Sequence, residues 1–311
     1  MENLDFQPVA RADFDGDGFK DALLRDEART GRFRMFTIVD QEVTAAGNPA
    51  MVEDLSLNVI GAAEFNGNDK ADVLLRDESG SPWLMYLFDG TRVVGFGESD
   101  LPPDRSTYPV GFGDFNGDGN DDIMLRKGDG RWQLRLMNGP VVIGKSMPDL
   151  PPRNVWAVVT VEDFDGDGID DLMLRRRDNG IWRFVKMDGL RVAAQERPDL
   201  PTGEDWEFVS AADFNGDGRS DLLMRHAGSG NWRAYLMDGS TIRNEGKLDI
   251  FSGAAWSFVE VDDYDADGKD DILVRRTDNG RWRVYLMNGL NVKEAKGLPM
   301  YRNSVWQPIV E

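Results

Sequence analysis

A nine-residue acidic segment recurs six times along the chain, and its side chains are suited to binding a cation. The copies read DFDGDGFKD, EFNGNDKAD, DFNGDGNDD, DFDGDGIDD, DFNGDGRSD and DYDADGKDD, and they begin at Asp13, Glu64, Asp114, Asp163, Asp213 and Asp263. When such a loop curls, the side chains at positions 1, 3, 5 and 9 converge, and the backbone carbonyl of position 7 adds another oxygen. Carboxylate-rich, all-oxygen ligation favours calcium, whereas magnesium demands a stricter octahedral geometry. We therefore predict about five to six calcium ions in these loops.

The predicted ligands differ between the copies in charge. In chain order they are Asp13, Asp15, Asp17, Phe19, Asp21, Glu64, Asn66, Asn68, Lys70, Asp72, Asp114, Asn116, Asp118, Asn120, Asp122, Asp163, Asp165, Asp167, Ile169, Asp171, Asp213, Asn215, Asp217, Arg219, Asp221, Asp263, Asp265, Asp267, Lys269 and Asp271. The loops that begin at Asp13, Asp163 and Asp263 carry four carboxylates each, and those at Asp114 and Asp213 carry three. The Glu64 loop carries two, and Asp69 replaces its turn glycine. We expect this loop to bind most weakly or to stay empty.

These loops are not EF-hands, because an EF-hand needs Glu at position 12. That position is apolar in every copy: Leu24, Leu75, Leu125, Leu174, Met224 and Val274. Two roles are open for the ions. They could act as a switch or a bridge to a ligand, or they could be structural and neutralise the clustered Asp so that the strands pair. The second role is favoured, because each loop must overcome its own charge repulsion.

The spacing of the loops predicts the fold. Successive copies begin 51, 50, 49, 50 and 50 residues apart, and a period of this size indicates a solenoid or a propeller. Each repeat contains four short strand signals separated by the acidic loop and by turns such as Asn179-Gly180. Second strands such as Leu222–Met224 are apolar on both faces, as expected for strands covered by neighbouring blades. We predict an all-β, six-bladed β-propeller of four-stranded blades.

The blade boundaries follow from the same period. We expect a single propeller domain over residues 1–311, with blades at 6–55, 56–105, 106–154, 155–204, 205–254 and 255–303. Residues 304–311 would then form an additional strand that closes the ring or recruits another chain. A seven-bladed ring that lacks part of one blade is the alternative.

Composition restricts the classes of function. The formal charge is -20, from 56 acidic and 36 basic residues, which argues against nucleic acid as a partner. The chain has no cysteine, so disulfides and thiolate metal sites are excluded. No apolar run approaches the roughly 18 residues of a membrane helix, so membrane insertion is not expected. The first residues do not resemble a signal peptide. Either the protein is cytoplasmic, or the sequence begins after a removed signal.

An Arg and an aromatic residue recur around one hairpin turn in every repeat. The Arg residues are Arg25, Arg76, Arg126, Arg175, Arg225 and Arg275, and the aromatic residues are Phe33, Trp83, Trp132, Trp182, Trp232 and Trp282. They would either bind a sugar or stabilise the contact between blades, and the structural role is favoured. A second series begins the first strands, at Trp156, Trp206, Trp256 and Trp306. These four are the candidate ligand-binding residues.

Nothing in the sequence indicates an enzyme. The only histidine, His226, is expected in a solvated turn, and no nucleophile motif or phosphate-binding loop is present. Clustered Asp residues can act as catalytic acid and base, but nearly all of the clustered Asp residues are already assigned to the calcium loops. We predict that the protein binds a partner rather than catalysing a reaction, and an enzyme acting on polysaccharide is the least favoured alternative.

The loops and the strands that follow them resemble FG-GAP or VCBS repeats. The pattern Phe-x-Gly-Asp-Gly-x-x-Asp, three apolar residues and Arg runs from Phe115 to Arg126 and again from Phe214 to Arg225. The resemblance covers nearly the whole chain. It implies a propeller with calcium in the loops between first and second strands, and adhesion, glycan binding or protein binding outside the cytoplasm or at the cell surface. The Phe-Gly and Gly-Ala-Pro signatures of integrin blades are absent, which points to the bacterial branch.

Three functions are therefore open. The first is an adhesion or lectin-like binding module with calcium, and the second is a protein-binding scaffold propeller of a larger secreted protein. The third is the polysaccharide-active enzyme. The expected partner is a glycan or a protein.

Overall fold

The computed structural model describes residues 6–39, 42–79, 82–151, 155–253 and 255–298. These residues form 24 strands in six four-stranded antiparallel sheets, and no helix occurs among them. Accordingly, the described part of the chain contains no helix long and apolar enough to cross a membrane. Each sheet pairs four consecutive strands in chain order. The predicted fold class, a six-bladed β-propeller, is confirmed. Trp306 and the additional strand predicted at 304–311 lie outside the described residues.

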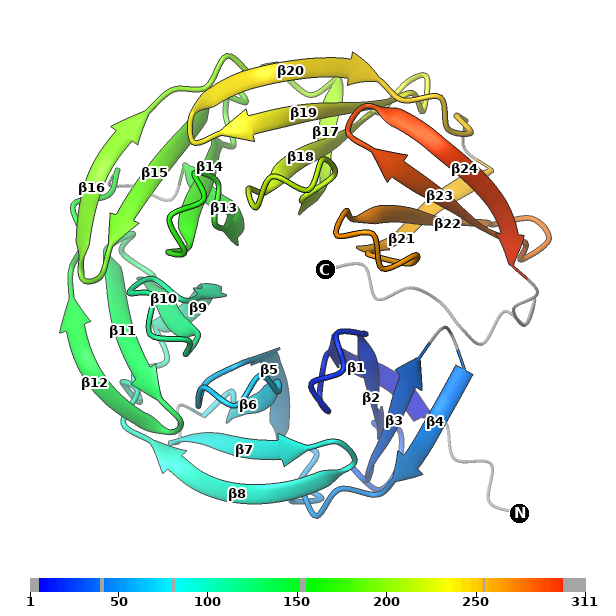
Figure 1. The fold of residues 1–311 in the computed structure, drawn as a ribbon. Coiled ribbons are helices and arrows are strands. Elements are labelled where there is room, and N and C mark those ends of the chain that lie inside the picture. Colours follow the sequence, from blue (N-terminus) through cyan, green and yellow to red (C-terminus); the bar gives the residue numbers. More distant parts are fainter. Residues whose placement is uncertain (1–5, 40–41, 80–81, 152–154, 254, 299–311) are drawn as a thin grey trace. The chain divides into compact units, whose positions relative to one another are not determined.

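The chain divides into two compact units with three blades each. One unit comprises Met1–Arg153 with Gly189–Arg191, and the other comprises Asn154–Asp188 with Val192–Glu311. In each unit, the first strands of the three blades lie on one side and the fourth strands on the opposite side (Figure 1).

The strands of the first unit are β1 (Phe6–Ala12), β2 (Asp21–Asp26), β3 (Phe33–Val39), β4 (Glu42–Gly47), β5 (Leu57–Ala63), β6 (Asp72–Asp77), β7 (Trp83–Asp89), β8 (Arg92–Ser99), β9 (Thr107–Gly113), β10 (Asp122–Lys127), β11 (Trp132–Asn138) and β12 (Val141–Ser146). Those of the second unit are β13 (Trp156–Glu162), β14 (Asp171–Arg176), β15 (Trp182–Asp188), β16 (Arg191–Glu196), β17 (Trp206–Ala212), β18 (Asp221–His226), β19 (Trp232–Asp238), β20 (Thr241–Lys247), β21 (Trp256–Asp262), β22 (Asp271–Arg276), β23 (Trp282–Asn288) and β24 (Asn291–Leu298).

The core lies between adjacent blades. The second strands are buried on both faces, as Val73, Leu74 and Leu75 of β6 illustrate, each with no exposed surface. One cluster joins Leu23 and Met35 of the first blade to side chains of the second, and equivalent clusters join the other neighbouring blades within each unit. The consecutive apolar residues in these strands are explained by this double burial.

The recurring Arg and aromatic residues form contacts in all six blades. Each guanidinium carbon lies 4.1–5.1 Å from the centroid of the paired ring. The strand register places the two residues opposite each other, as at Arg225 and Trp232. The rings are at most 8% exposed. Because their faces are buried, these aromatic residues stabilise the blades and do not present a sugar-binding surface.

The same side chains also join one blade to the next within a unit. Arg76 Nη1 donates a hydrogen bond to the Thr107 carbonyl (2.8 Å), and Arg225 Nη2 donates one to the Gly253 carbonyl (2.8 Å). The indole N–H of Trp232 donates to the Phe251 carbonyl at 3.0 Å. The Arg side chain thus satisfies a carbonyl of the segment that leads into the next blade, which is the structural role favoured from the sequence.

We predict that Arg225→Leu lowers the free energy of unfolding by about 2 kcal/mol. The change removes a charge-assisted hydrogen bond and a cation–π contact in a partly desolvated position. Thermal and denaturant unfolding measure the effect. Arg131→Met is the control: Arg131 is exposed and pairs with the exposed Asp129, so its loss should change stability by less than about 0.5 kcal/mol. Equal effects of the two substitutions would contradict the proposed role of Arg225.

Candidate metal centres

The first carboxylate of each acidic loop organises the backbone of that loop. Asp13 accepts hydrogen bonds from the N–H groups of Gly16 (2.7 Å) and Gly18 (2.8 Å). Asp163 accepts the same pair from Gly166 (2.7 Å) and Gly168 (2.8 Å). Glu64, Asp114, Asp213 and Asp263 likewise accept backbone N–H bonds from their own loops. These bonds hold each of the six loops in a curled conformation.

The last carboxylate of each loop is buried where the loop enters the second strand. The six residues are Asp21, Asp72, Asp122, Asp171, Asp221 and Asp271, and none is more than 1% exposed. One oxygen of each accepts a backbone N–H bond near the end of the third strand, at 2.7–3.0 Å. This carboxylate therefore fixes the loop to the blade.

Burial makes the charged form of this carboxylate costly. It raises the pKa of Asp21, Asp72, Asp221 and Asp271 to about 7, and the pKa of Asp122 and Asp171 to about 8. Backbone hydrogen bonds act in the opposite direction, but desolvation is the larger cause. A nearby cation would favour the charged form of each group.

Three loops bring carboxylates together in a way that could hold a metal ion. The groups are Asp13 with Asp15 and Asp17, Asp163 with Asp165 and Asp171, and Asp263 with Asp265 and Asp271, and within each the ligand atoms lie within 4.8 Å of one another. These are the three loops with four carboxylates. Buried oxygens of Asp15, Asp165 and Asp171 have no hydrogen-bond partner. Buried, unpaired carboxylate oxygens fit a hard cation such as calcium.

In the other loops, amide side chains donate hydrogen bonds within the acidic cluster. Asn66 Nδ2 donates to Asp72 (2.7 Å), and Asn215 Nδ2 donates to Asp221 (3.3 Å). Asn116 Nδ2 donates to Asp118 at 3.0 Å. The amide supplies a weak positive dipole where the four-carboxylate loops have a further negative charge. Because these loops carry fewer carboxylates, we expect their net attraction for a cation to be smaller.

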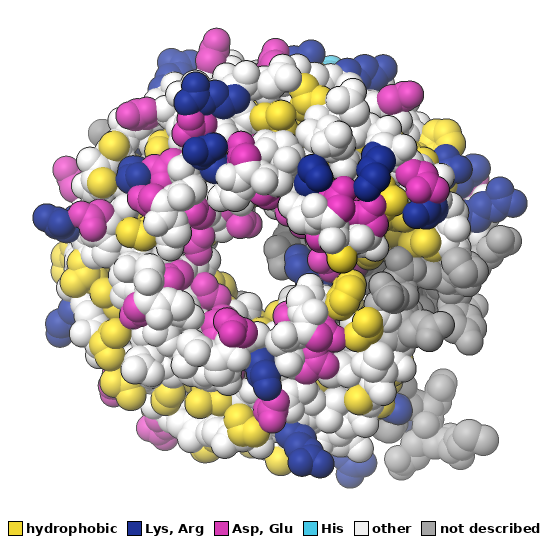
Figure 2. Space-filling view, viewed as in Figure 1, with side chains coloured by type: hydrophobic (Ala, Val, Ile, Leu, Met, Phe, Trp, Pro, Cys, Tyr) yellow, Lys and Arg dark blue, Asp and Glu magenta, His cyan; other side chains and the backbone are white. Residues whose placement is uncertain are grey.

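The loops of neighbouring blades contact each other within each unit. The N–H of Ala71 donates to the Asp13 carbonyl (2.7 Å), and the N–H of Ser220 donates to the Asp163 carbonyl (2.9 Å). An ion in one loop would therefore also stabilise the junction with the following blade. Figure 2 shows acidic side chains exposed on the blades, interspersed with Lys and Arg.

The position-7 residues were predicted to contribute their carbonyls: Phe19, Lys70, Asn120, Ile169, Arg219 and Lys269. In four of these, the side chain packs against a glycine of the preceding loop: Lys70 on Gly16, Asn120 on Gly67, Arg219 on Gly166 and Lys269 on Gly216. A side chain on any of these glycines would approach its neighbour to 3.1–3.3 Å, so the close packing depends on glycine.

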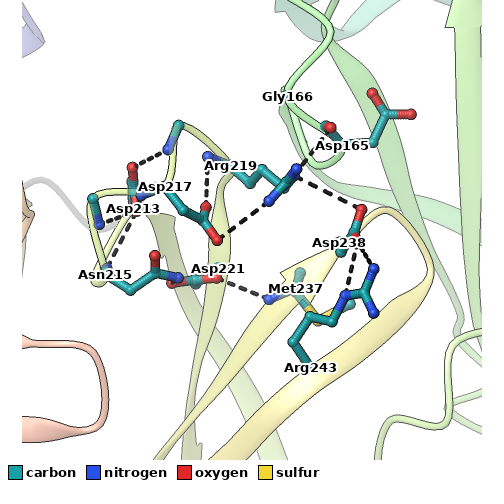
Figure 3. Close-up of polar contacts among 12 residues, drawn as sticks. Asp165, Gly166, Asp213, Asn215, Asp217, Arg219, Asp221, Met237, Asp238 and Arg243 are labelled. Atoms are coloured by element: carbon teal, nitrogen blue, oxygen red, sulfur yellow. Dashed lines mark hydrogen bonds and ion pairs between the residues drawn. The ribbon is translucent and has the colours of Figure 1, made fainter.

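Arg219 illustrates how a position-7 side chain contacts the loop of the preceding blade (Figure 3). Its Nε donates to the Asp165 carbonyl (3.1 Å) and lies 3.7 Å from Asp238 Oδ1, while Nη1 reaches Asp217 at 3.4 Å. Arg243 binds the other oxygen of Asp238. One guanidinium thus joins the acidic loop of the fifth blade to that of the fourth.

The candidate ligand-binding tryptophans are largely covered by other side chains. Trp156 is 7% exposed, with the guanidinium of Arg183 5.0 Å from its ring, and Trp206 and Trp256 are half-buried. Trp206 contacts the ring of His226 edge-on, and Trp256 stacks on Phe251 with centroids 5.1 Å apart. His226 lies at the end of β18 beside a turn, where its Nδ1 accepts backbone N–H bonds from Gly228 and Ser229 (3.2 Å each).

Sequence reasoning missed two lysines that bind loop carboxylates, Lys186 and Lys293. The signal for Lys186 is a departure from the repeat, because four blades have Leu at this position of the third strand. A position-by-position comparison of the third strands would have identified Lys186, whereas the position of Lys293 varies from blade to blade.

Six blades with acidic loops between their first and second strands define a repeat propeller, and the comparisons give its family. The profile of the FG-GAP-like repeat matches residues 114–174, 163–224 and 213–274, which together span over half of the chain. The chain belongs to the FG-GAP-like repeat family. This fold supports a role as a protein-binding module. No curated protein matches the chain.

Solved structures with the same fold are distant in sequence. The Photorhabdus luminescens Tc holotoxin pore is 14% identical with a TM-score of 0.62, and the match covers 94% of this chain. The chain spans only 14% of the length of that toxin chain. Kuenenia stuttgartiensis hydrazine synthase is 12% identical with a TM-score of 0.51, over 90% of this chain and 77% of that one. At these identities the likeness shows the fold alone.

We predict that Asp69→Gly raises the free energy of unfolding of the metal-free protein by about 1 kcal/mol. Asp69 occupies the glycine position of the Glu64 loop with φ of 61°, a left-handed conformation that is strained for a residue with a Cβ. Chemical denaturation in chelator measures the change.

The reverse exchange is the matched comparison. Gly18 has φ of 89° and no atom within 4 Å of an added Cβ, so Gly18→Asp tests backbone strain without a clash. It should destabilise the protein. A loss of stability in Asp69→Gly would show that the Asp69 side chain makes a contact worth more than the strain.

Proposed function

We propose that the protein is a calcium-stabilised β-propeller module that binds another protein outside the cytoplasm. The observation that carries this proposal is the set of three carboxylate groups in loops that join adjacent blades, two of which have unpaired buried oxygens. Calcium accepts six to eight oxygen ligands in flexible geometry, so it suits loops built from carboxylates and carbonyls. Sites of this kind in extracellular modules bind at about 10⁻⁴–10⁻³ M, which favours a compartment rich in calcium.

The number of carboxylates in each loop gives the expected order of calcium affinity. Asp13, Asp163 and Asp263 begin loops with four carboxylates, so these should bind most of the calcium. Loops with Asn at position 3 should bind more weakly, and the Glu64 loop should bind least. The ions would be structural, because the buried carboxylate of each loop is fixed to the third strand of its own blade.

A protein partner fits the surface better than a glycan. Large apolar side chains are exposed on the fourth strands of the second and third blades: Val94, Phe96, Val141, Ile143 and, just after β12, Met147. The exposures of Phe96 and Ile143 are 60% and 55%. A contiguous exposed apolar surface is typical of protein interfaces. These blades are neighbours, since the N–H of Asp100 donates to the Pro140 carbonyl (3.2 Å), and we place the partner, a protein with an apolar surface, there.

A lectin-like function has less support, because the recurring aromatic rings are buried against Arg side chains. We propose binding rather than catalysis, because the clustered carboxylates are assigned to the loops and His226 is occupied by backbone N–H groups.

Calcium should raise the melting temperature, and chelator should reverse the effect. At a calcium concentration 100 times the dissociation constant, each independent site adds about 2.7 kcal/mol to the free energy of unfolding. Asp15→Asn should lower the affinity of one site without unfolding the protein, because three other loops have Asn at this position: Asn66, Asn116 and Asn215. Titration calorimetry and melting curves measure both effects.

Glu78→Gln removes an exposed carboxylate outside the loops and serves as the control. It should leave the calorimetric titration unchanged. A melting temperature that is the same in calcium and in chelator would overturn the structural role of calcium.

The partner surface is tested by the double substitution Phe96→Ser with Ile143→Thr. In a pull-down in millimolar calcium, immobilised wild-type protein should bind a protein partner, and the immobilised double variant should not bind it. The matched control is Arg243→Thr, at the position of β20 that corresponds to Val94 and Ile143, and it should retain the partner. A glycan array on the same proteins decides the alternative: calcium-dependent binding of one sugar by both variants would establish a lectin and reject the apolar surface.

A further inference from the structure

Two of the three four-carboxylate loops already contain a cation that belongs to the protein. Lys186 of β15 binds Asp165, and its Nζ lies 2.8 Å from Asp167 Oδ2. Lys293 of β24 lies 2.9 Å from both Asp265 Oδ2 and Asp267 Oδ2. In both blades the ammonium group is shared by the position-3 and position-5 carboxylates. These are two of the side chains that a metal ion in the loop would need.

Neither lysine belongs to the repeat. Lys186 is the fifth residue of its strand, and the other blades have Thr37, Leu87, Leu136, Leu236 and Leu286 there. Lys293 is the third residue of its strand, and the other blades have Thr44, Val94, Ile143, Ala193 and Arg243 there. The two lysines come from different strands, and each places an ammonium at the position-3 and position-5 carboxylates of its own blade.

The third four-carboxylate loop has no such cation. Among the described residues, no Lys or Arg forms an ion pair with Asp13, Asp15 or Asp17. The residue that corresponds to Lys186 is Thr37, whose hydroxyl instead bonds the hydroxyl of Thr44 at 2.8 Å. The nearest lysine of the following loop, Lys70, binds Asp89 at 2.5 Å. The loops that look equal in sequence therefore differ in their counter-ions.

We propose that Lys186 and Lys293 are built-in counter-cations that compete with calcium for the loops of the fourth and sixth blades. The inference rests on the proposed calcium binding. A divalent ion in either loop must displace the ammonium from its carboxylates or lie beside a like charge, and both lower the affinity. The first-blade loop therefore fills at the lowest calcium concentration. The other two fill later, and the lysines keep their carboxylates neutralised when calcium is scarce.

The consequence is a graded response to calcium. At low calcium the fourth and sixth blades keep their loops closed by an internal ion pair, while the first blade depends on the metal. Because Lys186 and Lys293 are side chains of strands, each also ties the loop of its blade to a strand of the same blade. Removal of a lysine should therefore tighten calcium binding and weaken the metal-free blade.

Lys186→Leu and Lys293→Thr test the proposal with residues that other blades carry at these positions. Calcium titration by calorimetry should show that each substitution moves one site to higher affinity by at least about fivefold, the lower end of typical coupling between two ligands. In chelator, each should lower the melting temperature, and in saturating calcium the difference from wild type should shrink. Lys145→Met, an exposed lysine on β12, is the control and should change neither quantity.

The outcomes separate the two proposals. If wild-type protein binds calcium and neither substitution tightens a site, the competition is wrong and the calcium proposal stands. If wild-type protein binds no calcium at millimolar concentration, the calcium proposal fails and the competition with it. Tighter binding together with lower metal-free stability is the result that supports the counter-cation role.

Discussion

Every second strand begins with a buried carboxylate that fixes the acidic loop to its blade and whose charged form is costly. Asp21 and its five counterparts are sealed from solvent, yet each accepts a backbone N–H bond from the third strand of its blade. That bond is strongest with the carboxylate anion, whereas burial favours the neutral acid. A cation beside the loop resolves this conflict, because it stabilises the anion without removing its hydrogen bonds. A cation bound in the acidic loop would thereby stabilise the blade that contains the loop.

The six loops offset this cost with different groups. The loop of the first blade gathers further carboxylates and leaves an oxygen of Asp15 unpaired, which suits a divalent ion. Others replace a carboxylate by Asn, whose amide donates a hydrogen bond and lowers the repulsion. Two use the ammonium of a lysine from another strand. The same loop conformation is therefore compatible with a divalent ion, an Asn amide or a Lys ammonium beside its carboxylates. Blades of the same fold could thus differ in how much their stability depends on metal.

Much of the fold could be predicted from the sequence, because its signals are local and repeated. The period of about 50 residues, the doubly apolar second strands and the Arg-aromatic hairpins all follow from residues near each other in the chain. The burial of Trp156 and the contacts of Lys186 and Lys293 could not be predicted in this way. Whether a side chain at a strand end is covered depends on neighbouring turns, and a lysine reaches a loop only when its strand faces that loop in space. The packing of Arg219 on Gly166 is also invisible in sequence, since the two lie in different repeats.

The arrangement of the loops also bears on how a propeller of this kind can bind a partner. The loops contact one another and join adjacent blades, so their rigidity is shared along each unit. The exposed apolar side chains of β8 and β12 lie on the fourth strands, on the opposite side of the blades from the first strands. The proposed cation sites in the loops and the proposed partner surface on the outer strands therefore use different residues. A cation would act on the partner surface only by making the blades that carry it more rigid, which requires no bound ion at the interface itself.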